Sequence, residues 1–165
     1  MRWRFTDKAV SFAPWESIAI VKAGSLEEYG LLERFGESGL SPASLVLESC
    51  VQAARWLVEA SSSFAVSADL LEVDFWRVMP GLTPGERLYA SLRVEARHAG
   101  SVRFAAYQHR AAPGEAFFAE VLTPDGAREP DGVFSMAFSP LAERYLPGDR
   151  ACLWGELLSC GAEGL

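Results

Sequence analysis

The alternation of hydrophobic and polar residues along the chain predicts a protein rich in β-strands. The predicted strands are 3–12, 17–23, 64–79, 86–98, 101–111 and 133–141. The first two are interrupted near Pro14 and are expected to form a hairpin. Residues 98–101 (HAGS) are typical of a tight turn and predict a second hairpin. Residues 116–122 are compatible with one further strand.

One long apolar segment predicts a helix. Ser41 is a favoured N-cap, Pro42 is tolerated at the first helical position, and apolar residues continue to about Ala60. They fall on more than one side of the helix, which indicates that other structure encloses it. Shorter helices are predicted at 25–33 and around 149–158. One long helix among many long strands favours an α+β fold, a single domain spanning 1–165 in which a curled antiparallel sheet wraps the helix.

Glu48 lies deep in the apolar part of this helix, where another leucine would be expected. Ionised carboxylates are almost never buried without a partner. We therefore expect Glu48 either to have a structural partner or to take part in chemistry.

The composition and net charge of the chain exclude several classes of function. The chain has 165 residues and a net charge of −7, and no cluster of Lys and Arg stands out, which argues against nucleic-acid binding. Its three cysteines (Cys50, Cys152 and Cys160) lack metal-ligand spacing and are typical of reduced thiols in a cytoplasmic protein. With two histidines in the chain, we expect neither a metal nor another cofactor. The sequence shows no signal peptide and no apolar run long enough to span a membrane.

Residues 34–52 (RFGESGLSPASLVLESCVQ) run from a loop of small residues into the long helix, and residues 82–88 (LTPGERL) form a second loop. Both segments resemble motifs of the 3-hydroxyacyl-carrier-protein dehydratases, a family with the hot-dog fold. The family's active-site loop reads H-F-P-G-x-P-x-x-P-G and is followed by a helix with a catalytic acid and an Ala-Gln pair. In register with it, Phe35 falls on the Phe, Pro42 on the last Pro, Glu48 on the acid and Gln52 on the Gln.

Two further matches accompany this motif. The segment 82–88 (LTPGERL) is similar to the family's Val-x-Pro-Gly-Asp-x-Leu loop, and Asp7-Lys8 is similar to its N-terminal Asp-Arg/Lys pair. The resemblance covers most of the chain and implies a hot-dog fold that binds acyl thioesters of a carrier protein or of coenzyme A.

The resemblance also implies roles for the residues around the helix start. Glu48 would be the acid or base, and Gln52 would orient its carboxylate. The backbone N–H groups of Ala43 and Ser44 would stabilise the thioester oxygen at the positive end of the helix dipole. Ser44, one turn before Glu48, is a candidate nucleophile or water-orienting group.

The main departure from the family is Arg34, which falls on the catalytic histidine. A guanidinium stays protonated at neutral pH and cannot act as a base, and it favours the ionised form of a neighbouring carboxylate, which is a poor general acid. Neither His98 nor His109 lies near the motif in sequence. Three interpretations remain open: a dehydratase that uses Glu48 or another group, an acyl thioesterase in which Glu48 activates water or attacks the carbonyl, and a non-catalytic acyl-binding or partner subunit.

The resemblance and the physics of sheet edges both bear on partners. A long strand at an open sheet edge is usually paired or covered, so we expect a two-fold homodimer with a continuous sheet. Arg93, Arg97, Arg103 and Arg110 form either a basic patch for an acidic carrier protein or an ordinary solvated face.

Overall fold

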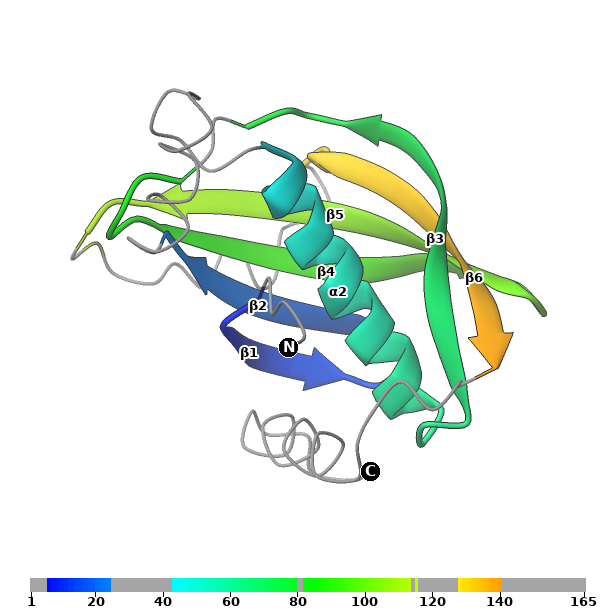
Figure 1. Cartoon of the computed structure of the whole chain (residues 1–165). Coiled ribbons are helices and arrows are strands. Elements are labelled where there is room, and N and C mark those ends of the chain that lie inside the picture. The colour runs from blue at the N-terminus through cyan, green and yellow to red at the C-terminus, as the bar shows by residue number, and fades with distance from the viewer. Residues whose placement is uncertain (1–5, 25–42, 80–81, 114, 116–127, 141–165) are drawn as a thin grey trace, which may run out of the picture.

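The protein has one helix and six strands in the part of the chain that the computed structural model describes, residues 6–24, 43–79, 82–113, 115 and 128–140. The elements are β1 (Lys8–Ala13), β2 (Ser17–Ala23), α2 (Ala43–Ser61), β3 (Val66–Trp76), β4 (Arg87–Arg97), β5 (Ser101–Ala111) and β6 (Gly132–Pro140). The strands form one antiparallel sheet in the order β1-β2-β4-β5-β6-β3. The helix lies across one face of this sheet, which curls around it (Figure 1). The predicted α+β architecture is confirmed.

Most strand positions agree with the sequence pattern. The strands β2 and β5 have the predicted bounds, and β1 pairs with β2 as the predicted hairpin. The second hairpin joins β4 to β5, and its turn is closed by a 2.9 Å hydrogen bond from the backbone N–H of His98 to the carbonyl of Ser101. The predicted elements at 25–33, 116–122 and 149–158 lie outside the described residues, as do Ser41 and Pro42.

The strand β3 is shorter than predicted at both ends, and the structure gives a reason at its start. Ser63 and Phe64 have positive φ angles of 52° and 60°, which stops the chain from extending directly after the helix. The N–H of Phe64 donates a 2.6 Å hydrogen bond to the carbonyl of Glu59, which satisfies one of the free carbonyls at the helix end. The strand therefore begins at Val66 instead of residue 64.

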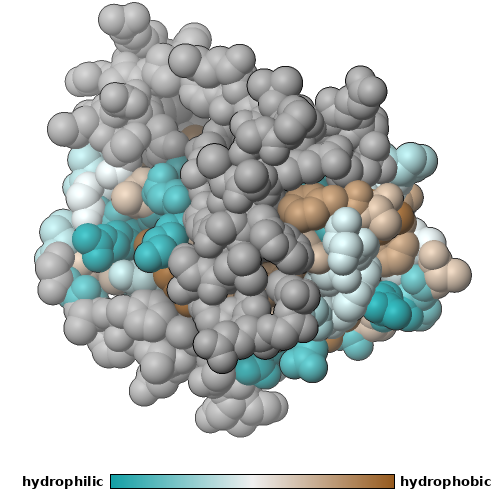
Figure 2. Space-filling model, turned by 90° about the horizontal axis from the view of Figure 1, so that it is seen from below, coloured by the Kyte–Doolittle hydropathy of each residue, from teal (hydrophilic) through white to brown (hydrophobic). Residues whose placement is uncertain are grey.

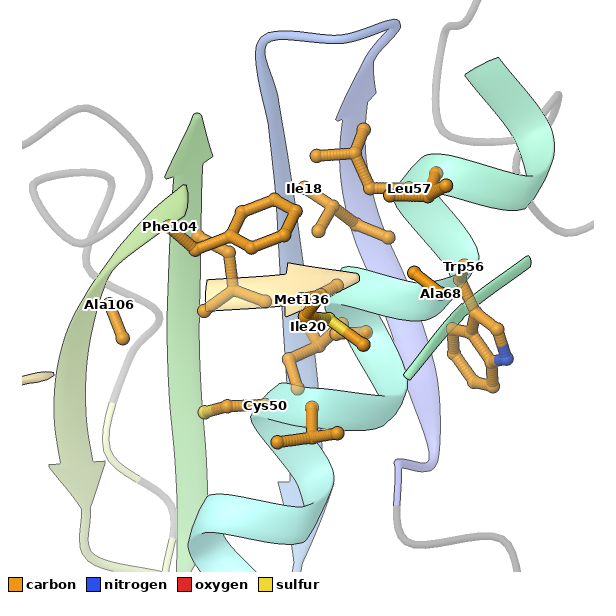
Figure 3. Close-up of a cluster of buried hydrophobic side chains, with 14 of the residues drawn as sticks. Ile18, Ile20, Cys50, Trp56, Leu57, Ala68, Phe104, Ala106 and Met136 are labelled. Atoms are coloured by element: carbon orange, nitrogen blue, oxygen red, sulfur yellow. The ribbon is translucent and has the colours of Figure 1, made fainter. Parts of the chain in front are cut away.

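The main core lies between α2 and the face of the sheet that it covers. Alternate strand residues such as Ile20, Phe104 and Met136 are fully buried there, together with Cys50 and Leu57 of the helix. Figure 3 shows these side chains, with Cys50 directed from the helix toward the sheet. Burying a large apolar side chain contributes about 1.5–3 kcal/mol, so this face fixes the position of the helix.

Candidate active site

A polar stripe runs along α2 and consists of Glu48, Gln52, Arg55 and Glu59. Their spacings of four, three and four residues place them on one side of a 3.6-residue helix. Because the sheet curls, both of its edges reach this stripe. On the side of β3, Arg55 Nε donates a 2.8 Å hydrogen bond to the carbonyl of Ala68. On the side of β1, the backbone N–H of Thr6 donates a 3.1 Å hydrogen bond to Gln52 Oε1.

The fully buried carboxylate of the helix is Glu59, whereas Glu48 is half-buried. Glu59 has an exposed fraction of 0%, and Ser67 Oγ donates a 2.6 Å hydrogen bond to its Oε1. The buried carboxylate with a partner is thus Glu59 and not Glu48, for which it was expected. The sequence does indicate this burial, because Glu59 is flanked by Leu57, Val58 and Ala60 and its neighbours are as apolar as those of Glu48.

Glu48 lies near the start of α2, one turn after the exposed Ser44. Among the described residues, no side chain or backbone group forms a hydrogen bond or ion pair with its carboxylate. Residues four apart share a helix face, so the hydroxyl of Ser44 and the carboxylate of Glu48 lie on the same side of the helix start. Ala43 is the first helical residue, and the N–H groups of a first turn have no acceptor within the helix. A half-buried carboxylate therefore lies one turn along the helix from N–H groups that have no acceptor within the helix.

The remaining predicted site residues are only partly placed. Gln52 lies one turn after Glu48, and its side-chain oxygen accepts a hydrogen bond from Thr6, two residues before β1. Thr6 adds a second tie there, from its Oγ1 to the carbonyl of Ser49 at 3.1 Å. Whether Gln52 also orients Glu48 stays a prediction. Arg34 lies outside the described residues, so an effect of its guanidinium on Glu48 stays a prediction as well.

A second buried carboxylate, also missed from the sequence, is Asp131, immediately before β6. Its side chain is 7% exposed and contacts two arginines, Arg77 and Arg128. The backbone N–H of Gln108 donates a further 2.8 Å hydrogen bond to Asp131 Oδ2. These residues come from three separate segments, so no local motif pointed to them.

One hollow of about 380 Å³ opens on the sheet, lined by Asp7, Val10, Val21, Ala23, Arg87 and Tyr89. Val21 and Tyr89 alternate with Ile20 and Leu88, whose side chains lie in the core. Neighbouring strand residues point to opposite faces, so this hollow is on the face away from α2. It is therefore separate from the chemistry at the helix start.

The arginines expected to form a basic patch are largely engaged with other side chains. Arg103 contacts Asp74 and Glu95, and Arg110 contacts Glu86. The guanidinium of Arg97 lies over the ring of Trp15 at 4.4 Å. Within the described residues, no helix has the length and apolarity to cross a membrane, and no three His, Cys, Asp or Glu side chains are placed to hold a metal ion.

The chain matches no protein-family model and no curated protein sequence. It does match solved structures. The smu.793 protein of Streptococcus mutans UA159, bound to acetyl-CoA, has a TM-score of 0.56 and 13% identity, over 85% of this chain and 94% of that one. A hypothetical thioesterase of Streptococcus pneumoniae TIGR4, solved with coenzyme A, has a TM-score of 0.51 and 8% identity, over 81% and 85%. A hot-dog-like protein of Thermanaerovibrio acidaminovorans has a TM-score of 0.53 and 11% identity, over 87% and 92%.

At these identities the similarity concerns the fold. The protein has the hot-dog fold, with a central helix packed against a six-stranded antiparallel sheet. Its structural neighbours include thioesterases.

Proposed function

We propose that the protein binds acyl thioesters and hydrolyses them, with Glu48 as the catalytic carboxylate. The observation that carries this proposal is the half-buried Glu48 near the start of α2, without a hydrogen bond or ion pair to any described residue. Among the described residues nothing competes with a ligand for Glu48, whereas Glu59 is occupied by Ser67. The acetyl-CoA and coenzyme A in two structural neighbours support an acyl-thioester ligand.

The chemistry follows from the helix start. Glu48 would take a proton from a water molecule as the water oxygen attacks the thioester carbonyl. The developing oxyanion would be stabilised by the backbone N–H groups of Ala43 and Ser44, which the helix dipole favours. The C–S bond then breaks, and the thiolate takes up the proton to leave as a thiol. This route uses an ionised glutamate and needs no histidine, so it tolerates Arg34 at the position of the family's histidine.

We also propose a two-fold dimer through β3. This strand of 11 residues is at an edge of the sheet, and it exposes Leu70, Leu71 and Phe75. Leu71 is 62% exposed. Apolar surface is visible on the side of the molecule where β3 and β6 lie (Figure 2). Because exposed apolar residues on an open edge favour pairing with another chain, a second copy of β3 is the occupant that symmetry favours.

The test is a turnover assay on the purified protein with a series of acyl-CoA thioesters. Release of free thiol supports hydrolysis, and Glu48→Gln should then lower kcat by about 10²–10⁴-fold. The matched control is Glu16→Gln, an exposed carboxylate in the turn between β1 and β2, which should leave kcat unchanged. Formation of an enoyl thioester from a 3-hydroxyacyl thioester would favour a dehydratase instead. Binding with no turnover of either substrate would assign the protein to the non-catalytic acyl-binding class.

A further inference from the structure

The ion cluster around Asp131 carries more positive than negative charge. Arg77 Nη1 lies 3.0 Å from Asp131 Oδ1, and Arg128 Nη2 lies 3.0 Å from Asp131 Oδ2. Two guanidinium groups thus share one carboxylate. One cation is enough to neutralise the carboxylate of Asp131. The second arginine therefore leaves the three side chains with a net positive charge.

Other ion pairs of arginine among the described residues do not have this excess of positive charge. Arg55 pairs with Asp69, and Arg110 pairs with Glu86, one charge against one. Arg103 lies between two carboxylates, which gives that cluster an excess of negative charge. The pair of Arg77 and Arg128 therefore contrasts with its surroundings in a chain whose net charge is −7.

Both arginines are held in place and still have donors to offer. The side chain of Arg77 is 62% exposed, and it contacts Asp131 through one terminal nitrogen. Arg128 donates from Nη2 to the carbonyl of Gln108 at 2.8 Å, and its guanidinium lies 5.9 Å from the ring centroid of Tyr107. A guanidinium has five N–H groups in a planar fork, which suits the oxygens of a phosphate. Because Asp131 orders the side chains in advance, binding an anion costs less conformational entropy.

The cluster is connected to the start of α2. Arg77 directly follows Trp76, which packs against the cluster formed by Leu82, Leu88 and Val46, the last of these in the first turns of the helix. Trp76 is fixed in turn by Gly132, where an added Cβ would lie 2.2 Å from its Cε3 atom. Arg77 thus directly follows a strand end that packs against the first turns of α2, where Glu48 lies.

We propose that Arg77 and Arg128 bind the phosphate of the pantetheine arm that carries the acyl group. The inference rests on the proposed function, because it assumes an acyl thioester at Glu48. The phosphate next to pantetheine is common to coenzyme A and to the prosthetic group of a carrier protein, so the site would serve either carrier.

The test compares the dissociation constants of three thioesters with the same acyl group, measured by calorimetry. These are acyl-pantetheine, acyl-4′-phosphopantetheine and acyl-CoA. The phosphorylated ligands should bind about 10-fold to 100-fold more tightly than acyl-pantetheine, and added salt should reduce this advantage. If acyl-4′-phosphopantetheine and acyl-CoA gain the same affinity over acyl-pantetheine, the phosphate next to pantetheine binds the arginines. If acyl-CoA alone gains affinity, its nucleotide phosphates bind there instead, which would contradict the proposal.

Substitutions then assign the effect to these residues. Arg77→Gln should remove most of the advantage of the phosphorylated ligands and leave acyl-pantetheine binding unchanged. This variant keeps Arg128 on Asp131, and thermal unfolding checks that it folds. Arg103→Gln is the matched control and should retain the full advantage, because Arg103 lies between two carboxylates. Equal affinity of the wild-type protein for all three thioesters, or an unchanged advantage in Arg77→Gln, would overturn the inference.

The outcome is separable from that of the proposed function. If acyl-pantetheine binds and the phosphate adds nothing, only the arginine site fails. If acyl-pantetheine does not bind, the proposed function fails, and free coenzyme A and inorganic pyrophosphate then test the arginines directly. Loss of their binding in Arg77→Gln would uphold an anion site, and no binding to the wild-type protein would exclude it.

Discussion

Ser67 Oγ donates a 2.6 Å hydrogen bond to Glu59 Oε1, and both residues are fully buried. Ser67 belongs to β3, and Glu59 belongs to the last part of α2. The bond joins the helix to an edge strand of the sheet at the point where the chain reverses. Removing the hydroxyl would leave a buried carboxylate short of a donor.

We expect Ser67→Ala to lower the free energy of unfolding by about 1–3 kcal/mol, because the buried carboxylate of Glu59 loses a hydrogen-bond donor. Urea denaturation measures this change. Ser139→Ala is the matched control, since Ser139 Oγ donates at 3.0 Å to Asp69, which is 43% exposed. That substitution should change stability by about 0.5 kcal/mol or less. Equal effects of the two would contradict the special role of the buried pair.

Cys50 should be unreactive in the folded protein. Burial raises the pKa of its thiol to about 12, and the carboxylate of Asp131 adds to this effect. Only about 10⁻⁴ of the thiol is then ionised near pH 8, and the thiolate is the reactive form. In a variant with Cys152 and Cys160 replaced by serine, a thiol reagent should label Cys50 only after denaturant is added. Rapid labelling of the native protein would show that the site opens.

Glu86 should stabilise the protein at neutral pH, and this stabilisation should be lost in acid. Its hydrogen bonds with the side chain of Arg110 and with Thr83 lower the pKa of Glu86 from 4.5 to about 2. A carboxyl with a lowered folded-state pKa stabilises the protein above the unfolded pKa, and this contribution is lost as the pH falls from about 4.5 toward 2. The stability difference between wild type and Glu86→Gln should therefore be present at neutral pH and shrink across this range. Glu129→Gln, at an exposed position, is the control.

Gln108 should tolerate an apolar replacement. Its side chain is 4% exposed, and neither Nε2 nor Oε1 has a hydrogen-bond partner in the described part of the chain. Replacing it with methionine, which has a similar length, removes an unsatisfied amide. We expect Gln108→Met to raise the free energy of unfolding by about 1 kcal/mol. A decrease in thermal stability would instead point to an ordered water on the amide.

The sequence by itself determined the local elements of this protein. Alternation of side chains specified β2 and β5 to the residue, and the apolar run specified α2, because strand and helix periodicity depend on neighbours along the chain. The polar stripe was also readable, since the spacing of Glu48 and Glu59 places them on one side of a helix.

Only the tertiary structure decided what each member of that stripe meets. The start of β3 lies against the end of α2 and buries Glu59, whereas Glu48 at the other end has no partner among the described residues. In the same way, Asp131 acquires Arg77 because antiparallel pairing of β3 and β6 brings their ends together. Burial and charge pairing depend on segments distant in sequence, and no local period encodes which of them will be neighbours.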